Sequence, residues 1–244
     1  MSDIELDRDY QKGDKEQKVK LIQEWLCLHG FHVVIDGDFG PATEHGVKVF
    51  QKKKRLKANG IVDQKTFRKL ILPMLNALKP ISGYKKLGKL VVAYAKQHLK
   101  QTPLEIGGQN KGPWVRLYMD GHEGAEWPWC AGFASYMLRQ AAKTLNVSLP
   151  IESSFSCDEL AAQAEQRKIF LPEAKADNKK IITPGSLFLV RASAKDWVHT
   201  GIVLKAGEQV LLTIEGNTND DGSREGYEVC RRIRGYEAKD FIII

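Results

Sequence analysis

The spacing of apolar residues changes once along this chain of 244 residues, and that change limits its fold more than any other feature. In the first part, apolar residues recur every three or four positions, the period of an amphipathic helix. In the last part, four short runs rich in β-branched residues follow one another, at 186–191, 199–205, 209–216 and 227–233. Helices followed by consecutive strands predict an α+β fold with an antiparallel sheet.

Three short helices are expected near the start of the chain, over residues 18–29, 42–54 and 66–75. Turns that contain glycine separate them, so this part can form a small bundle of its own. Further helices are expected over residues 89–100, from near residue 129 and from near residue 158. We find no internal repeat.

A stretch rich in turn-forming residues divides the chain. Residues 78–88 contain Pro80, Gly83 and Gly88, which is typical of a linker. We therefore predict a first domain over residues 1–78, a linker over 79–88 and a second domain over 89–244.

Charge and hydropathy narrow the choice of partners. The net charge of +7 favours polyanions such as acidic cell-wall polymers, nucleic acid or anionic lipid. No stretch approaches the roughly 18 apolar residues of a membrane span. Residues 1–17 lack the apolar core of a secretory signal peptide. We expect synthesis in the cytoplasm, no integral membrane association, and export by another system if the protein acts outside the cytoplasm.

A spaced pattern runs through all three expected N-terminal helices. It reads Val19-x-x-Ile22-Gln23-x-x-Leu26, Asp36-Gly37-x-Phe39-Gly40-x-x-Thr43, Val47-x-x-Phe50-Gln51 and Leu56-x-x-x-Gly60-Ile61-Val62-Asp63-x-x-Thr66. Over residues 12–75 the pattern resembles the peptidoglycan-binding domain 1 family of three-helix wall-binding modules. The resemblance implies bacterial peptidoglycan as the partner. Asp63 stands where this family often has glycine.

Cys130 is the candidate nucleophile of the second domain. It falls on the first turn of an expected amphipathic helix. There, unpaired N–H groups and the partial positive charge of the helix lower a thiol pKa and can stabilise an oxyanion. The alternative is that Cys130 is a small buried apolar residue.

The other three cysteines are assigned structural roles. Cys157 also begins a helix, behind a Ser156 N-cap, but Asp158 and Glu159 would raise its pKa. Cys27 and Cys230 are expected in the core. The four cysteines form no C-x-x-C pair, so we expect mostly free thiols.

Three polar residues on two expected strands complete a candidate site. His199 opens one strand and is a candidate general base. Glu215 and Asn217 alternate along the next strand, so both can lie on one face and orient the His199 ring. Val210, Leu212 and Ile214 are expected on the opposite, core-facing side. The alternative is a surface histidine with a solvent-facing glutamate and a turn asparagine.

Four spaced motifs carry a second resemblance. They are Trp129-Cys130-Ala131-x-Phe133, Pro184-Gly185-x-Leu187, His199-x-Gly201-Ile202-Val203 and Glu215-Gly216-Asn217-Thr218. They resemble the CHAP family of papain-like amidases and endopeptidases, which is related to the NlpC/P60 group. The resemblance implies helices packed on an antiparallel sheet, Cys130 as nucleophile, His199 as base, and Glu215 with Asn217 as orienting residues. It implies no metal and no cofactor.

The surroundings of the site leave several choices open. Trp114, Trp127 and Trp129 either line a groove for sugar or peptide or pack in the core. Asn110 is a candidate polar group of the cleft. Residues 217–228 nearly match a calcium-binding loop, but their flanks are expected strands, so we predict a turn with no obligatory calcium.

Together the two resemblances imply a peptidoglycan hydrolase that cleaves an amide bond. It would be an N-acetylmuramoyl-L-alanine amidase or an endopeptidase of the stem or cross-bridge, in an arrangement that resembles phage endolysins. Two alternatives stay open: an interbacterial toxin-type wall amidase, and a non-catalytic wall-binding or scaffold protein. We expect a monomer and no nucleic-acid partner, because only the net charge supports one.

Overall fold

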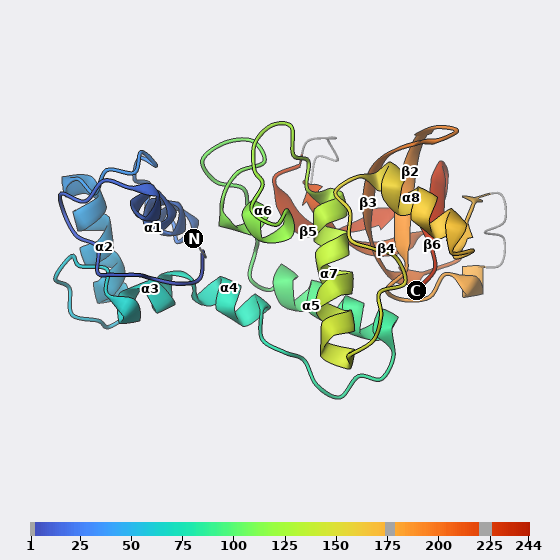
Figure 1. The fold of residues 1–244 in the computed structure, drawn as a ribbon, viewed down its shortest axis with the longest axis horizontal. Coiled ribbons are helices and arrows are strands. Elements are labelled where there is room, and N and C mark those ends of the chain that lie inside the picture. Colours follow the sequence, from blue (N-terminus) through green and yellow to red (C-terminus); the bar gives the residue numbers. More distant parts are fainter. Residues whose placement is uncertain (1–2, 174–178, 220–225) are drawn as a thin grey trace.

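The structure is a computed structural model that describes residues 3–173, 179–219 and 226–244. Figure 1 shows α1 to α3 at one end of the long axis and the sheet at the other, with α4 to α7 between them. The helices are α1 (Gln17–Leu28), α2 (Pro41–Lys53), α3 (Gln64–Leu70), α4 (Leu72–Ala77), α5 (Leu87–Leu99), α6 (Pro113–Tyr118), α7 (Cys130–Leu145), α8 (Cys157–Gln166) and the short 3-10 helix η2 (Lys179–Ile181). The strands are β1 (Phe170–Leu171), β2 (Leu187–Ser193), β3 (Asp196–Ala206), β4 (Leu211–Thr218), β5 (Glu228–Arg234) and β6 (Lys239–Ile242).

The six strands form one antiparallel sheet in the order β1-β6-β2-β3-β4-β5. Strands β2 to β5 are neighbours in the order of the chain, whereas β6 returns to pair with β2. Helices α7 and α8 pack against β3, and α7 also packs against β4. The predicted α+β class is confirmed. Within the described ranges, no helix combines the length and apolar character needed to cross a bilayer.

Local sequence explains most element ends, and also one difference from expectation. The single helix expected over residues 66–75 is two helices, α3 and α4, that meet at Ile71. Pro73 lies in the first turn of α4, where it lacks an N–H and would clash with a continuing helix. Asp63 caps α3, because its side chain accepts a hydrogen bond of 2.7 Å from the Thr66 N–H.

The N-terminal helices contain a repeat that we did not find in the sequence. Gln23 on α1 and Gln51 on α2 are both buried, and each holds the turn that follows its helix. The amide of Gln23 donates to Thr43 Oγ1 (3.1 Å), and its oxygen accepts from the N–H groups of residues 36 and 37. The amide of Gln51 donates to Thr66 Oγ1 (3.2 Å), and its oxygen accepts from the N–H of residue 60. The expectation of no internal repeat is therefore wrong: two Val-Lys-x-x-Gln segments perform the same structural task.

The N-terminal helices and the rest of the chain share one continuous hydrophobic core. Trp25 on α1 packs edge-on against Trp114 on α6, with ring centroids 5.9 Å apart. Helix α4 contacts α5, although residues 78–86 between them form no helix. The boundaries predicted at residues 78 and 88 stay predictions.

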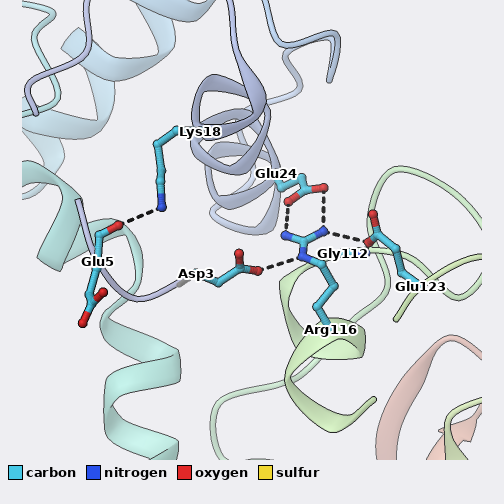
Figure 2. Close-up of polar contacts among 7 residues, drawn as sticks. All are labelled: Asp3, Glu5, Lys18, Glu24, Gly112, Arg116 and Glu123. Carbon is cyan, nitrogen blue, oxygen red and sulfur yellow. Dashed lines mark hydrogen bonds and ion pairs between the residues drawn. The ribbon is translucent and has the colours of Figure 1, made fainter. Parts of the chain in front are cut away.

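Arg116 on α6 joins these two parts of the molecule through charge (Figure 2). Its guanidinium bonds Glu24 on α1, Asp3 in the N-terminal segment and Glu123 in the loop after α6, with closest distances of 2.7 Å to each. Lys18 also binds the N-terminal segment, because its Nζ donates a hydrogen bond of 2.8 Å to the Glu5 carbonyl oxygen. The Glu24 side chain is only 2% exposed, so its ion pair with Arg116 is largely buried, whereas Asp3 and Glu123 are partly exposed.

Candidate active site

The start of α7 is held at a fixed place against the sheet, and Cys130 is its first residue. Trp129, the residue before it, is buried, stacks on Tyr118 and donates its indole N–H to Glu105 at 2.7 Å. Gly216 on β4 lies directly under this turn, because a Cβ there would come within 2.8 Å of both Phe133 and Trp129. The missing side chain at Gly216 therefore lets the N-terminus of α7 approach β4.

His199 on β3 connects the thiol to an acid. Its Nε2 lies 2.8 Å from Glu215 Oε2 on β4. The Cys130 thiol interacts with the His199 ring, and this interaction lowers the pKa of the thiol and raises the pKa of the imidazole. Gly201 makes room for this arrangement, since a Cβ there would come within 2.6 Å of the Glu215 side chain.

Glu215 is completely buried and bonded to three side chains. Besides His199, Thr213 Oγ1 donates to Oε1 at 2.5 Å. Arg234 on β5 donates from Nε to Oε1 (3.0 Å) and from Nη2 to Oε2 (2.6 Å). Burial raises the pKa of Glu215, but hydrogen bonds and charge from His199 and Arg234 outweigh it and bring the pKa down to about 2.

The same contacts set the charges of Cys130 and His199. Burial lowers the pKa of His199, but the bonds to Cys130 and Glu215 prevail and raise this pKa to about 9. The hydrogen bond with Cys157 lowers the pKa of Cys130, burial raises it, and the bond and charge of His199 lower it further, so it lies well below its ordinary value. Near neutral pH the pair is therefore a thiolate and an imidazolium.

Cys157 lies against Cys130, which the sequence did not lead us to expect. It is the first residue of α8, behind the predicted Ser156 N-cap, and its Sγ is 3.9 Å from the Sγ of Cys130. The hydrogen bond to Cys130, burial and the charges of Cys130 and Asp158 all raise its pKa. Cys27 and Cys230, expected in the core, are only half-buried.

Two cavities open on either side of this group. One of about 490 Å³ is lined by Cys130 and Cys157 together with Trp127, Phe155 and Trp197. The other, of about 270 Å³, is lined by His199, Asn110 and Asn217. Trp127 and Asn110 therefore lie where a substrate-binding role would place them, and that role stays a prediction.

The structure corrects the assignment of two other aromatic residues. Trp114 and Trp129 are both fully buried, so neither lines a groove, and the core-packing alternative holds for them. Trp114 contacts Trp25 and Tyr118, whereas Trp129 anchors the start of α7 through Tyr118 and Glu105. Both indole rings are needed to hold elements together rather than to meet a ligand.

Asn217 differs from its expected place. It lies two residues after Glu215 on β4 and has a φ of 53°. Its side chain lines the smaller cavity, and no hydrogen bond to the His199 ring is described. Its Oδ1 is buried and has no hydrogen-bond partner among the residues that the structure describes. The orienting role of Asn217 stays a prediction, because Glu215 occupies the Nε2 position.

The expected core face of β4 is also wrong in part. Ile214 is buried as predicted, but Val210 and Leu212 are exposed. Leu211, Thr213 and Glu215 alternate on the other face and are buried. A second small core around Phe188 and Phe241 lies on that side of the sheet and covers it, which is why a glutamate there is buried.

Arg234 and Thr213 are the site residues that sequence reasoning missed. Arg234 lies within an alternating run of charged and apolar residues on β5, which is indistinguishable from a solvated strand face in the sequence. Only the pairing of β4 with β5 brings its guanidinium to Glu215. No group of three or more potential metal-ligating side chains occurs in ranges 3–173, 179–219 and 226–244. Residues 220–225, half of the calcium-like loop at 217–228, lie outside the described residues.

Comparison with known proteins identifies the first domain. A family model described as putative peptidoglycan binding domain matches residues 15–70. This part of the chain is a domain of that family. The match covers less than half of the chain and does not extend to Cys130, His199 or Glu215.

One solved structure is also similar to part of this chain. It is a peptidoglycan-binding protein from Clostridioides difficile in complex with glutamine hydroxamate, with 38% identity over 29% of this chain. The TM-score is 0.26, and the match spans 42% of that protein's chain, less than half its length. No curated protein sequence matches this chain.

Proposed function

We propose that this protein is a peptidoglycan hydrolase that cleaves an amide bond with the Cys130 thiolate. The observation that carries the proposal is the buried chain of contacts from Cys130 through His199 to Glu215. A helix N-terminus, an imidazole and an oriented carboxylate form the arrangement that activates a thiol for acyl transfer. The peptidoglycan-binding domain at residues 15–70 supports the bacterial cell wall as the substrate.

The reaction would proceed in two steps. The Cys130 thiolate attacks the amide carbonyl carbon, and N–H groups at the start of α7 stabilise the oxyanion. The imidazolium of His199 gives its proton to the leaving amine as the C–N bond breaks, which leaves a thioester on Cys130. Neutral His199 then takes a proton from water as the water attacks the thioester, and the freed thiolate restores the starting ion pair. Glu215 holds the His199 ring in place throughout and stabilises it whenever it is charged.

The two cavities offer room on both sides of the bond to be cut. The aromatic cavity beside Cys130 would take one part of the substrate, and the polar cavity beside His199 the other. The unpartnered Oδ1 of Asn217 can accept an N–H of the substrate there. The bond would be either the sugar–peptide amide or a peptide bond of the stem or cross-bridge, since both present the same group to the thiolate.

We also propose that the protein acts as a phage-type lysin that reaches the wall through a separate release system. An interbacterial toxin-type amidase would use the same chemistry. A non-catalytic wall-binding protein would not require the Cys130–His199–Glu215 arrangement, so this alternative is the one that the site itself opposes.

The test is mass spectrometry of purified peptidoglycan after incubation with the wild-type protein or with Cys130→Ala. New products with the wild type alone would support the proposal, and their masses would identify the bond. Binding of both proteins to sedimented wall controls for folding, because the variant keeps residues 15–70. Equal digestion by both proteins would remove Cys130 as the nucleophile, and wall binding without products would favour a binding protein.

A further inference from the structure

The proposed mechanism uses one cysteine, but the structure places two cysteines together. Cys130 and Cys157 are each the first residue of a helix, α7 and α8, and their sulfurs are 3.9 Å apart. They are 5% and 7% exposed, and both line the larger cavity, so a small molecule in it can reach them. Cys157 thus lies on the cavity wall beside the reactive thiol rather than deep in the core.

The spacing of the two sulfurs suits a disulfide. A disulfide bond is about 2 Å long, so the sulfurs need to move roughly 2 Å closer together. Rotation about a Cα–Cβ bond moves the sulfur of a cysteine and can supply a change of this size. The other two cysteines lie on α1 and β5, on different elements from this pair.

The two thiols also differ in the way that oxidation requires. The hydrogen bond from Cys157 and the bond and charge of His199 lower the pKa of Cys130, and the thiolate is the form that peroxides oxidise. The hydrogen bond to Cys130, burial and the negative charges of Cys130 and Asp158 raise the pKa of Cys157 and keep it a thiol. Oxidation removes the negative charge of Cys130, so the pKa of Cys157 falls. The Cys157 sulfur then becomes a better nucleophile.

We propose that Cys130 and Cys157 form a reversible disulfide when the protein meets a peroxide, with Cys157 as the resolving cysteine. The thiolate of Cys130 attacks one peroxide oxygen, the O–O bond breaks, and a sulfenic acid and hydroxide result. The Cys157 sulfur then attacks the Cys130 sulfur, the S–S bond forms, and the sulfenic oxygen leaves as water with the Cys157 proton. Two thiol groups are oxidised by two electrons, and hydrogen peroxide is reduced to water.

The consequence for activity rests on the proposed function, because only a nucleophilic Cys130 would be blocked by the bond. The enzyme would be inactive while oxidised and would recover with a dithiol reductant. Cys157 would also protect Cys130 from irreversible oxidation to sulfinic acid. Hydrolysis of the wall would then depend on the redox state of the compartment in which the protein is present.

Peptide mapping of the full-length protein tests the bond directly. The reduced protein is treated with hydrogen peroxide, remaining thiols are alkylated with iodoacetamide, and the digest is analysed without reductant. We expect a linked pair of peptides that contain Cys130 and Cys157, with Cys27 and Cys230 still alkylated. Cys27→Ser is the matched control and should form the same link. If the wild-type digest contains Cys130 as sulfinic acid and no linked pair of peptides, the proposal is overturned.

Activity on peptidoglycan provides the second readout. Peroxide should reduce wild-type activity by about tenfold or more, and dithiothreitol should restore it. In Cys157→Ser and Cys157→Ala, excess peroxide should carry the sulfenic acid of Cys130 on to sulfinic acid, which dithiothreitol does not reduce, so the loss should persist, each variant being measured against its own untreated activity. Equal recovery in these variants would refute a resolving role for Cys157. A linked pair in a protein with no hydrolytic activity before oxidation would uphold the disulfide and reject the proposed function.

Discussion

Glu215 has the most demanding environment of the candidate site. A fully buried carboxylate is costly unless it is paired, and here His199 and Arg234 both pair with it. Arg234 keeps Glu215 ionised, and Glu215 in turn keeps the His199 ring in place and charged. Arg234 is therefore a positioning residue, because it acts on His199 only through Glu215.

Arg234→Gln should lower kcat/KM by about tenfold, since the two charged hydrogen bonds from the guanidinium to Glu215 are lost. The pKa of Glu215 should rise, so the acid limb of the pH–rate profile should move to higher pH. Arg231→Gln removes the same charge from the exposed neighbour on β5 and is the control. A lower rate with an unmoved acid limb would indicate a structural role only.

The pH dependence of activity follows from the raised pKa of His199. The proton that the leaving amine needs is present below about pH 9 and is lost above it, because this pKa lies near 9. Cys130 remains a thiolate well below that pH. We expect kcat/KM on a soluble muropeptide to hold through neutral pH and fall above about pH 9. In Glu215→Gln the fall in kcat/KM should occur at lower pH, because Glu215 raises the pKa of His199. A fall near the ordinary histidine pKa in the wild type would contradict the Cys130–His199 ion pair.

At the scale of elements, the site depends on how closely α7 approaches β4. Gly216 lies between Glu215 and Asn217, and the start of α7 rests where its side chain would be. Packing therefore explains why a glycine stands between Glu215 and Asn217.

Gly216→Ala should move α7 away from the sheet, since the new methyl group would overlap Phe133 and Trp129. Such overpacking costs about 1–3 kcal/mol in the free energy of unfolding. Hydrolysis should fall by more than wall binding, because the Cys130–His199 contact joins α7 to β3 of the sheet. Gly235→Ala has open space around it and serves as the control in urea denaturation and activity assays. Unchanged stability and rate in Gly216→Ala would mean that the contact can relax at no cost.

At the scale of the whole molecule, the peptidoglycan-binding domain is packed against the rest of the chain. The shared core and the Arg116 cluster join α1, α6 and the N-terminal segment (Figure 2). Wall binding would therefore present the Cys130 site in one orientation relative to the bound polymer.

Arg116→Met should lower the free energy of unfolding by about 3 kcal/mol at neutral pH, because it leaves Glu24 buried without its partner. Burial already raises the pKa of Glu24. Glu24 should therefore take up a proton as the pH falls, and the defect should shrink. The double variant Arg116→Met with Glu24→Gln should recover much of the loss in chemical denaturation. An equal loss in the single and double variants would show that packing, not charge, holds the two parts together.

Sequence alone determined the features that depend on neighbours along the chain. The helices before the strands and the place of Cys130 at a helix start follow from periodicity and turn chemistry. The resemblance over residues 12–75 also used sequence alone, and the family model that matches residues 15–70 confirms it. The division at Pro73 was not predicted, although it too has a local cause, because proline acts on its own helix.

Tertiary structure decided the features that depend on residues far apart in the chain. It brought Cys157 to Cys130 and Arg234 to Glu215, and it buried Trp114 and Trp129 while exposing Leu212. A thiol, an arginine or a tryptophan has no local pattern that reveals its partner. The partner is set by which strands pair and which helices cover them, and this is why the predicted nucleophile could be named from the sequence but its neighbouring thiol could not.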